Sequence, residues 1–337
     1  MTNGVSLVES LVAQRHLYFT AFQLYDSCPR AFLWGNGYGN LDLGRGPGRS
    51  KLKPNKDTDS KHHAVMGIVL ARAVEHLYND ELWREPETLV ARLTDLVNRE
   101  FTFALNESYI DWKEAPPKQE MLKVCVSGAV GYLKTMKANK LLGPYAKSEV
   151  DLTAWVDQYT PIGGRPDVII RREDNGVTII DGKNAMTPGK YTDPDQLRWY
   201  ALCFYLAYNV VPNRLAFAYF RYPEGTPPKD HPEGTPWTGL VDVSLTREDL
   251  QAMGVRAKET HRAIHKELFD PSPSSKACKF CDYRTVCDAA HTPTPRKTRA
   301  LPVVVEGTVE HTIENSDGIV EFGFGTDVSG VKTSTKP

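Results

Sequence analysis

The sequence contains no long apolar run and no excess of charge of either sign. Nowhere do about 18 apolar residues follow one another, and residues 1–10 do not join a basic start to an apolar stretch, so neither a membrane span nor a secretion signal is expected. The chain has 41 Lys and Arg residues against 42 Asp and Glu residues. This balance excludes a protein-wide basic field, so any surface for a polyanion must be local. We expect a soluble, cytoplasmic protein.

Cysteine is also scarce. Six cysteines in 337 residues are too few for a small disulfide scaffold. Cys125 and Cys203 fall within apolar helical stripes, where a thiol usually packs as a small hydrophobe. The other four lie in polar, loop-like contexts and are candidate metal ligands. The chain also lacks a phosphate-binding loop of the G-x4-G-K-[ST] type, which argues against a helicase function.

What is present has the composition and patterning of an α/β protein, with 41% hydrophobic and 25% charged residues. Apolar residues at helical spacing predict helices around Val65–Leu77, Leu89–Leu105 and Met121–Met136. Runs of β-branched and aromatic residues bounded by Gly, Pro and Asn predict strands. These strands are Ser148–Val156, Pro166–Arg171, Val177–Asp181, Leu215–Tyr222 and Leu240–Leu245, with helices at Pro194–Tyr208 and from Thr246 to about Phe269.

The pattern divides the chain into parts of different composition. They are an aromatic N-terminal segment (1–34), a Gly-rich basic loop (35–60), a helical subdomain (61–145), the α/β core (146–270), a cysteine-rich segment (271–290) and a tail (291–337). The basic loop fits a solvated insertion and a DNA-backbone contact equally well. The pentapeptide PEGTP, at 223–227 and 232–236, indicates a decorated hairpin loop. The tail could add a hairpin or remain loose.

The sharpest chemical signal is a hairpin that carries carboxylates. Asp167 ends the run Gly-Arg-Pro-Asp, and Asp181 opens the run Asp-Gly-Lys after the turn 174–176. Asp181 and Lys183 are two apart on a strand and share a face. A two-residue turn would put Asp167 opposite Asn184 and on the other face from Asp181. A three-residue turn pairs Asp167 with Lys183 and Ile169 with Asp181, and a five-residue turn keeps the same parity; we predict one of these two.

Such a hairpin predicts a divalent-metal site. Two carboxylates about 4 Å apart repel by roughly 4 kcal/mol at an effective dielectric constant of 20, so a cation is needed between them. Oxygen ligands with open positions suit Mg²⁺ or Mn²⁺, and Lys183 could hold or activate the attacking water. Glu149 could complete the metal shell or pair with a basic side chain. The same spacing also fits a surface hairpin with an Asp–Lys ion pair.

A helix follows the hairpin and carries two further polar residues. Asp193 caps it and Pro194 begins it, so Gln196 and Tyr200 share a face near its N-terminus, where phosphate is favoured. The pattern equally fits an Asp193–Gln196 capping box with Tyr200 in the core. The two interpretations are compatible.

Taken together, these motifs resemble the PD-(D/E)XK nuclease superfamily. Gly-Arg-Pro-Asp167, Asp181-Gly-Lys183 and Gln196-x-x-x-Tyr200 are similar to its RecB-like branch. Tyr25-Asp-Ser-Cys28-Pro and Cys278-x-x-Cys281-x5-Cys287 resemble the iron–sulfur version found in AddB-type helicase-nucleases and Cas-four exonucleases, including phage-borne relatives. The resemblance extends over 17–290. It implies a restriction-endonuclease-like mixed sheet flanked by helices, Asp167 and Asp181 as metal ligands, Lys183 as the catalytic lysine, and Gln196 and Tyr200 as its support.

The cysteine spacing alone leaves two centres open. Four thiolates bind zinc or an iron–sulfur cluster. A lone Cys28 some 250 positions before a cluster of three matches the [4Fe–4S] arrangement of the family, so the resemblance favours that cofactor with a structural role. By analogy with a disulfide, a clamp between the N- and C-terminal parts would stabilise the fold by about 5 kcal/mol.

One position departs from the family. Four residues after Gly67 the family has a metal-binding histidine, and this chain has Ala71. His62, His63 or His76 could substitute, or a water could take the place. The enzyme could also have lost activity.

These observations predict a metal-dependent DNA nuclease. We expect an exonuclease on single strands or duplex ends, dependent on Mg²⁺ or Mn²⁺, acting in recombination, repair or CRISPR-type processing with protein partners of such pathways. Arg165, Lys190 and Arg198 are expected to hold the DNA backbone. The alternative is a DNA-binding or assembly subunit that keeps the fold without the chemistry. A zinc-stabilised protein unrelated to nucleic acid is a third possibility.

Overall fold

The computed structural model describes most of the chain. The described residues are 16–35, 62–108, 110, 112, 115–172, 176–184, 192–274, 277–278, 281, 283, 287–291, 308–314 and 320–325. The chain forms two compact units, Met1–Asp270 and Pro271–Pro337. No helix within the described residues is long and apolar enough to cross a membrane.

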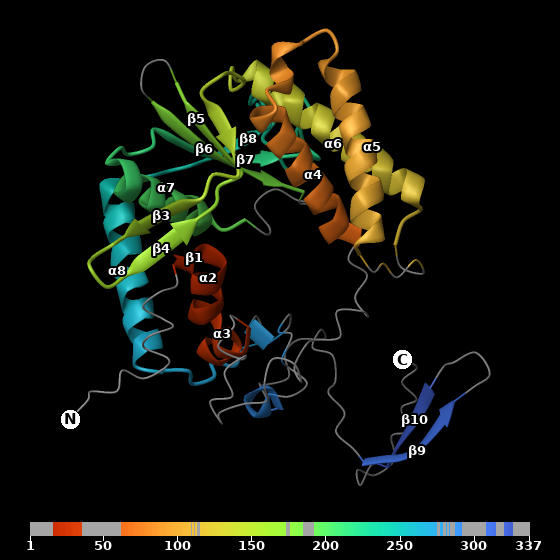
Figure 1. The fold of residues 1–337 in the computed structure, drawn as a ribbon, viewed down its shortest axis with the longest axis vertical. Helices are drawn as coiled ribbons and strands as arrows, with labels where there is room; N and C mark the ends of the chain where they lie inside the picture. Colours follow the sequence, from red (N-terminus) through yellow and green to blue (C-terminus); the bar gives the residue numbers. More distant parts are fainter. Residues whose placement is uncertain are drawn as a thin grey trace. The chain divides into compact units, whose positions relative to one another are not determined.

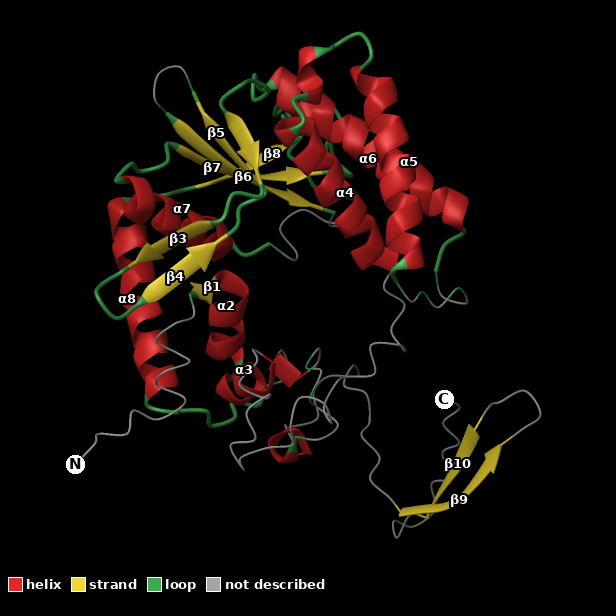
Figure 2. Cartoon of the chain, viewed as in Figure 1, coloured by secondary structure: helices red, strands yellow, loops and turns green. Residues whose placement is uncertain are grey.

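A five-stranded mixed sheet forms the centre of the first unit (Figures 1 and 2). Its order is β2 (Ala146–Ser148), β5 (Val168–Arg171), β6 (Val177–Lys183), β7 (Arg214–Tyr219) and β8 (Leu240–Val243). Strands β6 and β7 are parallel, whereas the other neighbouring pairs are antiparallel. The parallel pair needs a crossover, and α7 (Pro194–Tyr208) supplies it.

Three long helices cover one face of this sheet. They are α4 (His62–Asn79), α5 (Leu89–Asn106) and α6 (Lys118–Ala138), with the short helix η2 (Leu82–Arg84) between the first two. Their apolar faces pack in one cluster with Val168, Ile170 and Ile180 of the sheet. This arrangement directs the alternate residues of β5 and β6 to the opposite face.

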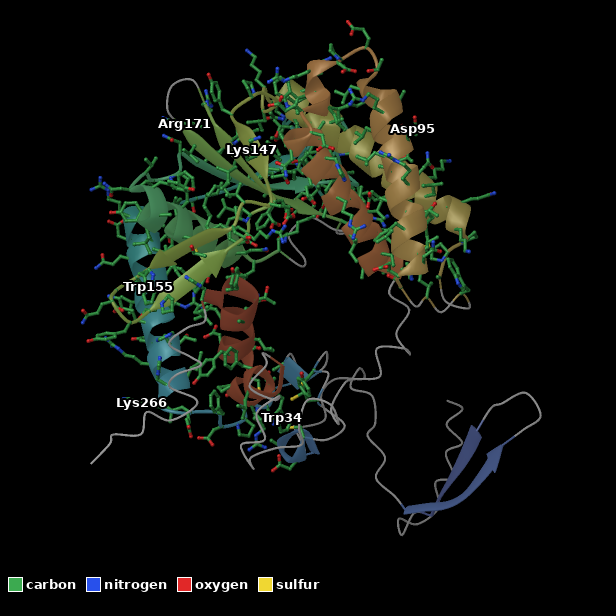
Figure 3. All side chains as sticks on the ribbon, in the orientation of Figure 1. Trp34, Asp95, Lys147, Trp155, Arg171 and Lys266 are labelled. Atoms are coloured by element: carbon green, nitrogen blue, oxygen red, sulfur yellow. The ribbon has the colours of Figure 1, made fainter. Side chains whose placement is uncertain are left out.

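A second, three-stranded sheet lies across α7 from the first. Its order is β1 (Leu17–Tyr18), β4 (Pro161–Gly164) and β3 (Leu152–Trp155). The indole of Trp199 on α7 donates to Gly163 O at 2.9 Å, and its ring stacks on Phe22. Trp155, on β3, is exposed on the outer side of this sheet (Figure 3). Helix α7 is therefore enclosed between the two sheets.

Helices from both ends of the first unit meet beside α7. They are α2 (Phe19–Ser27), α3 (Pro29–Gly35) and α8 (Arg247–His265). Tyr25 donates to Leu268 O at 2.6 Å, and Phe269 lies against Tyr25 and Phe32. Residues near 25 and near 268 are thus neighbours in space.

Two sequence expectations for this unit need correction. The predicted strand Ser148–Val156 is two strands of different sheets, because the chain turns at Glu149, whose φ is +55°. Strands β1 and β4 were not predicted, because two or four residues show no alternation. The PEGTP copies do lie in the β7–β8 connection as expected, and their glycines, Gly225 and Gly234, both have positive φ.

The second unit contains η3 (Asp288–His291) and an antiparallel hairpin of β9 (Thr308–Glu314) and β10 (Val320–Gly325). Of the two outcomes left open for the tail, the structure has the hairpin.

Candidate active site

The β5–β6 hairpin brings the two aspartates opposite each other. Val168 pairs with Ile180 and Ile169 with Ile179, so one further step places Asp167 across from Asp181. The parity is as predicted. The strands end at Arg171 and Val177, so five residues connect them, as in the second of the two predicted turns; the pairs Asp167–Lys183 and Ile169–Asp181, which the three-residue turn required, do not form. Residues 173–175 of this connection lie outside the described residues.

A polar network joins the hairpin to α7. Lys183 Nζ lies 2.5 Å from Asp181 Oδ2 and donates to Gln196 Oε1 at 2.9 Å. Gln196 Nε2 lies 3.1 Å from Asp181 Oδ1 and 3.0 Å from the Tyr200 hydroxyl. The ammonium of Lys183 also lies 5.4 Å from the centre of the Phe217 ring. Four of the residues predicted for the site therefore form one connected group.

The start of α7 explains why Gln196 is free to join this group. Asp193 Oδ1 accepts from the backbone N–H of Asp195 at 3.0 Å, and Pro194 occupies the first turn. Asp193 Oδ2 accepts from Gln23 of α2 at 2.9 Å. The Gln196 side chain does not bond to the backbone N–H of Asp193, so it does not complete a capping box. It points into the site instead, as the other sequence interpretation required. Tyr200 is buried, as the core interpretation required.

Burial sets the electrostatics of the aspartates. Burial raises the pKa of Asp167, and the neighbouring Asp181 and Glu149 raise it further. The hydrogen bond that Asp167 Oδ2 accepts from the Gly182 N–H at 2.6 Å lowers the pKa and opposes this rise. Burial also raises the pKa of Asp181, although Lys183 opposes that rise. The buried Asp181 and the partly buried Asp167 share one ammonium, so the site carries uncompensated negative charge when both are ionised.

This arrangement fits a divalent cation. Asp181 is 3% exposed, and its Oδ2 contacts the Lys183 ammonium as its one charged partner among the described residues. Carboxylate oxygens held in this way are the ligands that Mg²⁺ and Mn²⁺ prefer. Within the described residues, however, no three His, Cys, Asp or Glu side chains are gathered closely enough to hold a metal. The preformed part of the site is therefore the pair Asp167 and Asp181.

Glu149 lies beside the pair but faces a base. Its carboxylate is 2.7 Å from Nε of Arg165, which is the second of the two roles weighed for it from sequence. Its backbone N–H donates to Asp167 O at 3.1 Å. Glu149 is thus tied to Asp167 through the backbone while its side chain is held elsewhere.

The histidines that could replace the one absent at Ala71 have other neighbours. His76 Nδ1 lies 2.6 Å from Asp80, on the same helix. His62 and His63 lie ring to ring, with centroids 3.9 Å apart. Burial lowers the pKa of His63, with a further contribution from His62. None of these joins a three-residue metal group in the described part of the chain.

Of the basic residues predicted to hold DNA, two are described. Arg165 is half exposed and paired with Glu149. Arg198 pairs with Asp195 at 3.1 Å and reaches Ser244 O at 3.4 Å, at the start of α7. Lys190 lies outside the described residues.

Of the four candidate ligand cysteines, Cys28, Cys278 and Cys281 are partly exposed, whereas Cys287 is buried, which the polar context of the sequence did not predict. Cys125 and Cys203 are fully buried, and burial raises the pKa of Cys125 to about 12. Cys28 follows the end of α2, and its N–H donates to Leu24 O at 2.9 Å. Cys278, Cys281 and Cys287 belong to the second unit, and all six thiols are free of disulfides. The assignment of a cofactor to Cys28, Cys278, Cys281 and Cys287 stays a prediction.

Two residues that support the site were not found from sequence. The Ser148 hydroxyl donates to Asp167 O at 2.5 Å. Asn79, near the end of α4, holds both backbone groups of Ser148, accepting from its N–H at 3.1 Å and donating to its carbonyl at 3.3 Å. These contacts bridge 69 residues of sequence, so no local pattern announces them.

The sequence of this chain matches a known family over the residues that form the site. Residues 16–288 match the family model of the PD-(D/E)XK nuclease superfamily. The chain belongs to this superfamily. PD-(D/E)XK nucleases use the divalent metals Mg²⁺ and Mn²⁺, and most members are metal-dependent nucleases. The mixed α/β architecture is consistent with a PD-(D/E)XK fold.

Two other comparisons add little. The crystal structure of SSO0001 is similar over 52% of this chain and 80% of its own, with 17% sequence identity and a TM-score of 0.30. No curated protein matches the chain.

Proposed function

We propose that this PD-(D/E)XK protein is a divalent-metal-dependent deoxyribonuclease that acts as an exonuclease on single-stranded DNA or duplex ends. The observation that carries the proposal is the network of Asp167, Asp181, Lys183, Gln196 and Tyr200 at the edge where β6 meets α7. A purely structural ion pair would not need a second carboxylate opposite it.

Each residue of the network has a proposed task. Asp167 and Asp181 would hold the cation, which supplies Lewis acidity to the scissile phosphate and neutralises the site. Lys183, fixed by Gln196 Oε1, would orient the attacking water and stabilise the charge that develops on phosphate oxygens. Gln196 would hold the side chains of Asp181 and Lys183 in position, and Tyr200 would hold Gln196 in place.

Charge around this site supports a backbone contact rather than base reading. Arg165 lies two residues before Asp167, and Arg198 lies one turn from the start of α7. We propose that both, with Lys190, bind phosphates of the strand being cut. With Ala71 in place of a histidine ligand, we expect weaker metal binding and higher activity with Mn²⁺ than with Mg²⁺.

We also propose a [4Fe–4S] cluster on Cys28, Cys278, Cys281 and Cys287, because their arrangement resembles that of the iron–sulfur branch of the superfamily. Anaerobically prepared protein should contain about four iron atoms per chain and show broad visible absorbance. Zinc without iron in the same preparation would contradict this assignment.

The test of the proposed function is a nuclease assay on labelled DNA with Mg²⁺ or Mn²⁺. Asp181→Asn should abolish cleavage without unfolding the protein. Asp95→Asn, which removes an exposed carboxylate on α5, is the matched control and should cut normally (Figure 3). Full activity in Asp181→Asn would overturn the assignment.

The second candidate function is a DNA-binding or assembly subunit of a recombination, repair or CRISPR-type complex. Ala71 in the position of a metal ligand favours it. Tight DNA binding with no metal-stimulated cleavage by the wild-type protein would select this candidate.

A further inference from the structure

Glu149 and Arg165 form an ion pair next to Asp167, to whose backbone carbonyl Glu149 donates. Arg165 Nε lies 2.7 Å from Glu149 Oε2 and donates to Glu149 O at 3.3 Å, so one side chain binds both the carboxylate and the backbone of the other. The Arg165 side chain is 52% exposed and that of Glu149 is 20% exposed. The guanidinium is therefore accessible, whereas the carboxylate is mostly covered.

The backbone of Glu149 is held in a conformation that an unbranched residue adopts only when its surroundings impose it. Its φ is +55°, in the left-handed region, which costs roughly 1 kcal/mol or more for a residue with a Cβ. The N–H of Glu149 and the hydroxyl of Ser148 both donate to Asp167 O, and Asn79 fixes Ser148. The backbone is thus locked to Asp167, and the flexible side chain is left as the moving part.

The side chain has two directions available. Toward the aspartates it meets like charge: burial raises the pKa of Glu149, Arg165 opposes that rise, and Glu75 and Asp181 add to it. Toward solvent it meets Arg165, whose Nε also lies 4.0 Å from Asp151 Oδ1. Without a cation the balance favours Arg165; a divalent cation between Asp167 and Asp181 reverses the sign of the field on that side.

We propose that Glu149 and Arg165 form a latch that couples metal binding to DNA binding. When a divalent cation binds, Glu149 turns from Arg165 to the metal as a third carboxylate, and the released guanidinium becomes free to bind a DNA phosphate. This proposal rests on the proposed function, because it assumes that Asp167 and Asp181 hold the metal. By linkage, DNA must strengthen metal binding by the same factor as metal strengthens DNA binding.

The first test needs no metal and no cleavage. Fluorescence anisotropy with a labelled single-stranded oligonucleotide in EDTA should show that Glu149→Gln binds about five-fold more tightly than wild type, because Arg165 is already released. In an Arg165→Ala background, Glu149→Gln should change the affinity by less than about two-fold. Equal tightening in both backgrounds would mean that DNA affinity rises only because the repulsion between Glu149 and the phosphates is lost, and it would overturn the latch. No tightening at all would also overturn it.

Controls separate the latch from general charge effects. Glu85 and Arg92 form an exposed pair at the same 2.7 Å separation, away from the hairpin, so Glu85→Gln and Arg92→Ala repeat the same charge changes. They should leave the metal dependence of DNA binding unchanged. Glu149→Asn is a second variant, since asparagine tolerates a positive φ and cannot reach Arg165 in the same way. It should behave as Glu149→Gln does.

The second test adds Ca²⁺ in place of a catalytic metal. Ca²⁺ should tighten DNA binding by wild type about five-fold more than it does for Glu149→Gln or Arg165→Ala. Equal effects in all three proteins would overturn the proposal. If the latch pattern appears but Mg²⁺ and Mn²⁺ give no cleavage, the nuclease assignment fails and the latch stands. If no protein binds DNA under any condition, both fail.

Discussion

Gln196 binds Asp181 with its amide nitrogen and Lys183 with its amide oxygen, so one neutral side chain fixes an acid and a base at once. Neither Glu nor Lys at this position could do both, because a carboxylate only accepts and an ammonium only donates. The orientation of the amide is therefore set by its two charged neighbours.

Replacing Gln196 with alanine should lower kcat by about ten-fold or more, equivalent to about 1.4 kcal/mol, because Lys183 loses the group that orients it. The apparent metal affinity should change less, since Asp167 and Asp181 remain. Steady-state cleavage over a Mn²⁺ series measures both quantities. Gln251→Ala, at an exposed position of α8, is the control, and an equal loss in that variant would contradict the prediction.

Asp167→Asn should stabilise the metal-free protein by about 1–2 kcal/mol while abolishing cleavage. The carboxylate is partly buried opposite Asp181, and an amide oxygen can still accept the Gly182 N–H. Urea denaturation in EDTA measures the change in the free energy of unfolding. A destabilised variant would show that the buried charge is better compensated than its neighbours indicate.

The same residue gives a pH dependence of stability. The folded-state pKa of Asp167 is raised above its ordinary value of 3.8, so the folded state holds its proton more tightly. Its contribution to stability is present below pH 3.8 and is lost as pH rises through the raised pKa. The difference in unfolding free energy, wild type minus Asp167→Asn, should therefore fall with rising pH in EDTA. Saturating Mg²⁺ should reduce that fall, because the metal favours the ionised form.

His261 should produce the opposite trend. Burial, aided by His265, lowers its pKa from 6.5 to about 4, and its Nε2 has no hydrogen-bond partner. Stability from this group is present above pH 6.5 and is lost as pH falls toward 4, by about 1.4 kcal/mol per unit within that window. His261→Met should flatten the acid limb of a plot of unfolding free energy against pH. An unchanged slope would contradict the prediction.

Gly164→Ala tests the packing behind the site. A Cβ at this position would lie 2.9 Å from Cδ1 of Tyr200 and 3.3 Å from Sγ of Cys203, so the Tyr200 ring must move. We expect a loss of about 1–3 kcal/mol in stability and a lower cleavage rate. Gly143→Ala is the matched control, because a Cβ there meets nothing within 4 Å. Equal effects in the two variants would show that the close contact is not the cause.

The sequence predicted the main helices and the strands that carry chemistry, because each has a long periodic pattern or a clear boundary. The parity of the hairpin could also be predicted, since Asp167, Asp181 and Lys183 had to share a face to be useful. The register itself could not, because it depends on turn residues whose pairing differs by two positions between equally plausible turns.

The features that could not be predicted depend on contacts between residues that are far apart in the sequence. The division of the predicted strand Ser148–Val156 between two sheets depends on the left-handed Glu149, and glutamate carries no signal for a positive φ. The supporting contacts of Asn79 and Ser148, like the pairing of Glu149 with Arg165, arise only when separate elements pack.

The pairing of β1 with β4 determines which truncated versions of the protein remain soluble. A fragment of 62–270 would keep α4, α5 and α6 but lose β1, which covers one edge of β4, and the ring of Phe22 that lies on Trp199, exposing an unpaired backbone edge next to a large indole. Such a fragment should express as insoluble material even though it retains every acidic and basic group of the hairpin. The opening residues therefore have to be included in any shortened version intended for biochemistry.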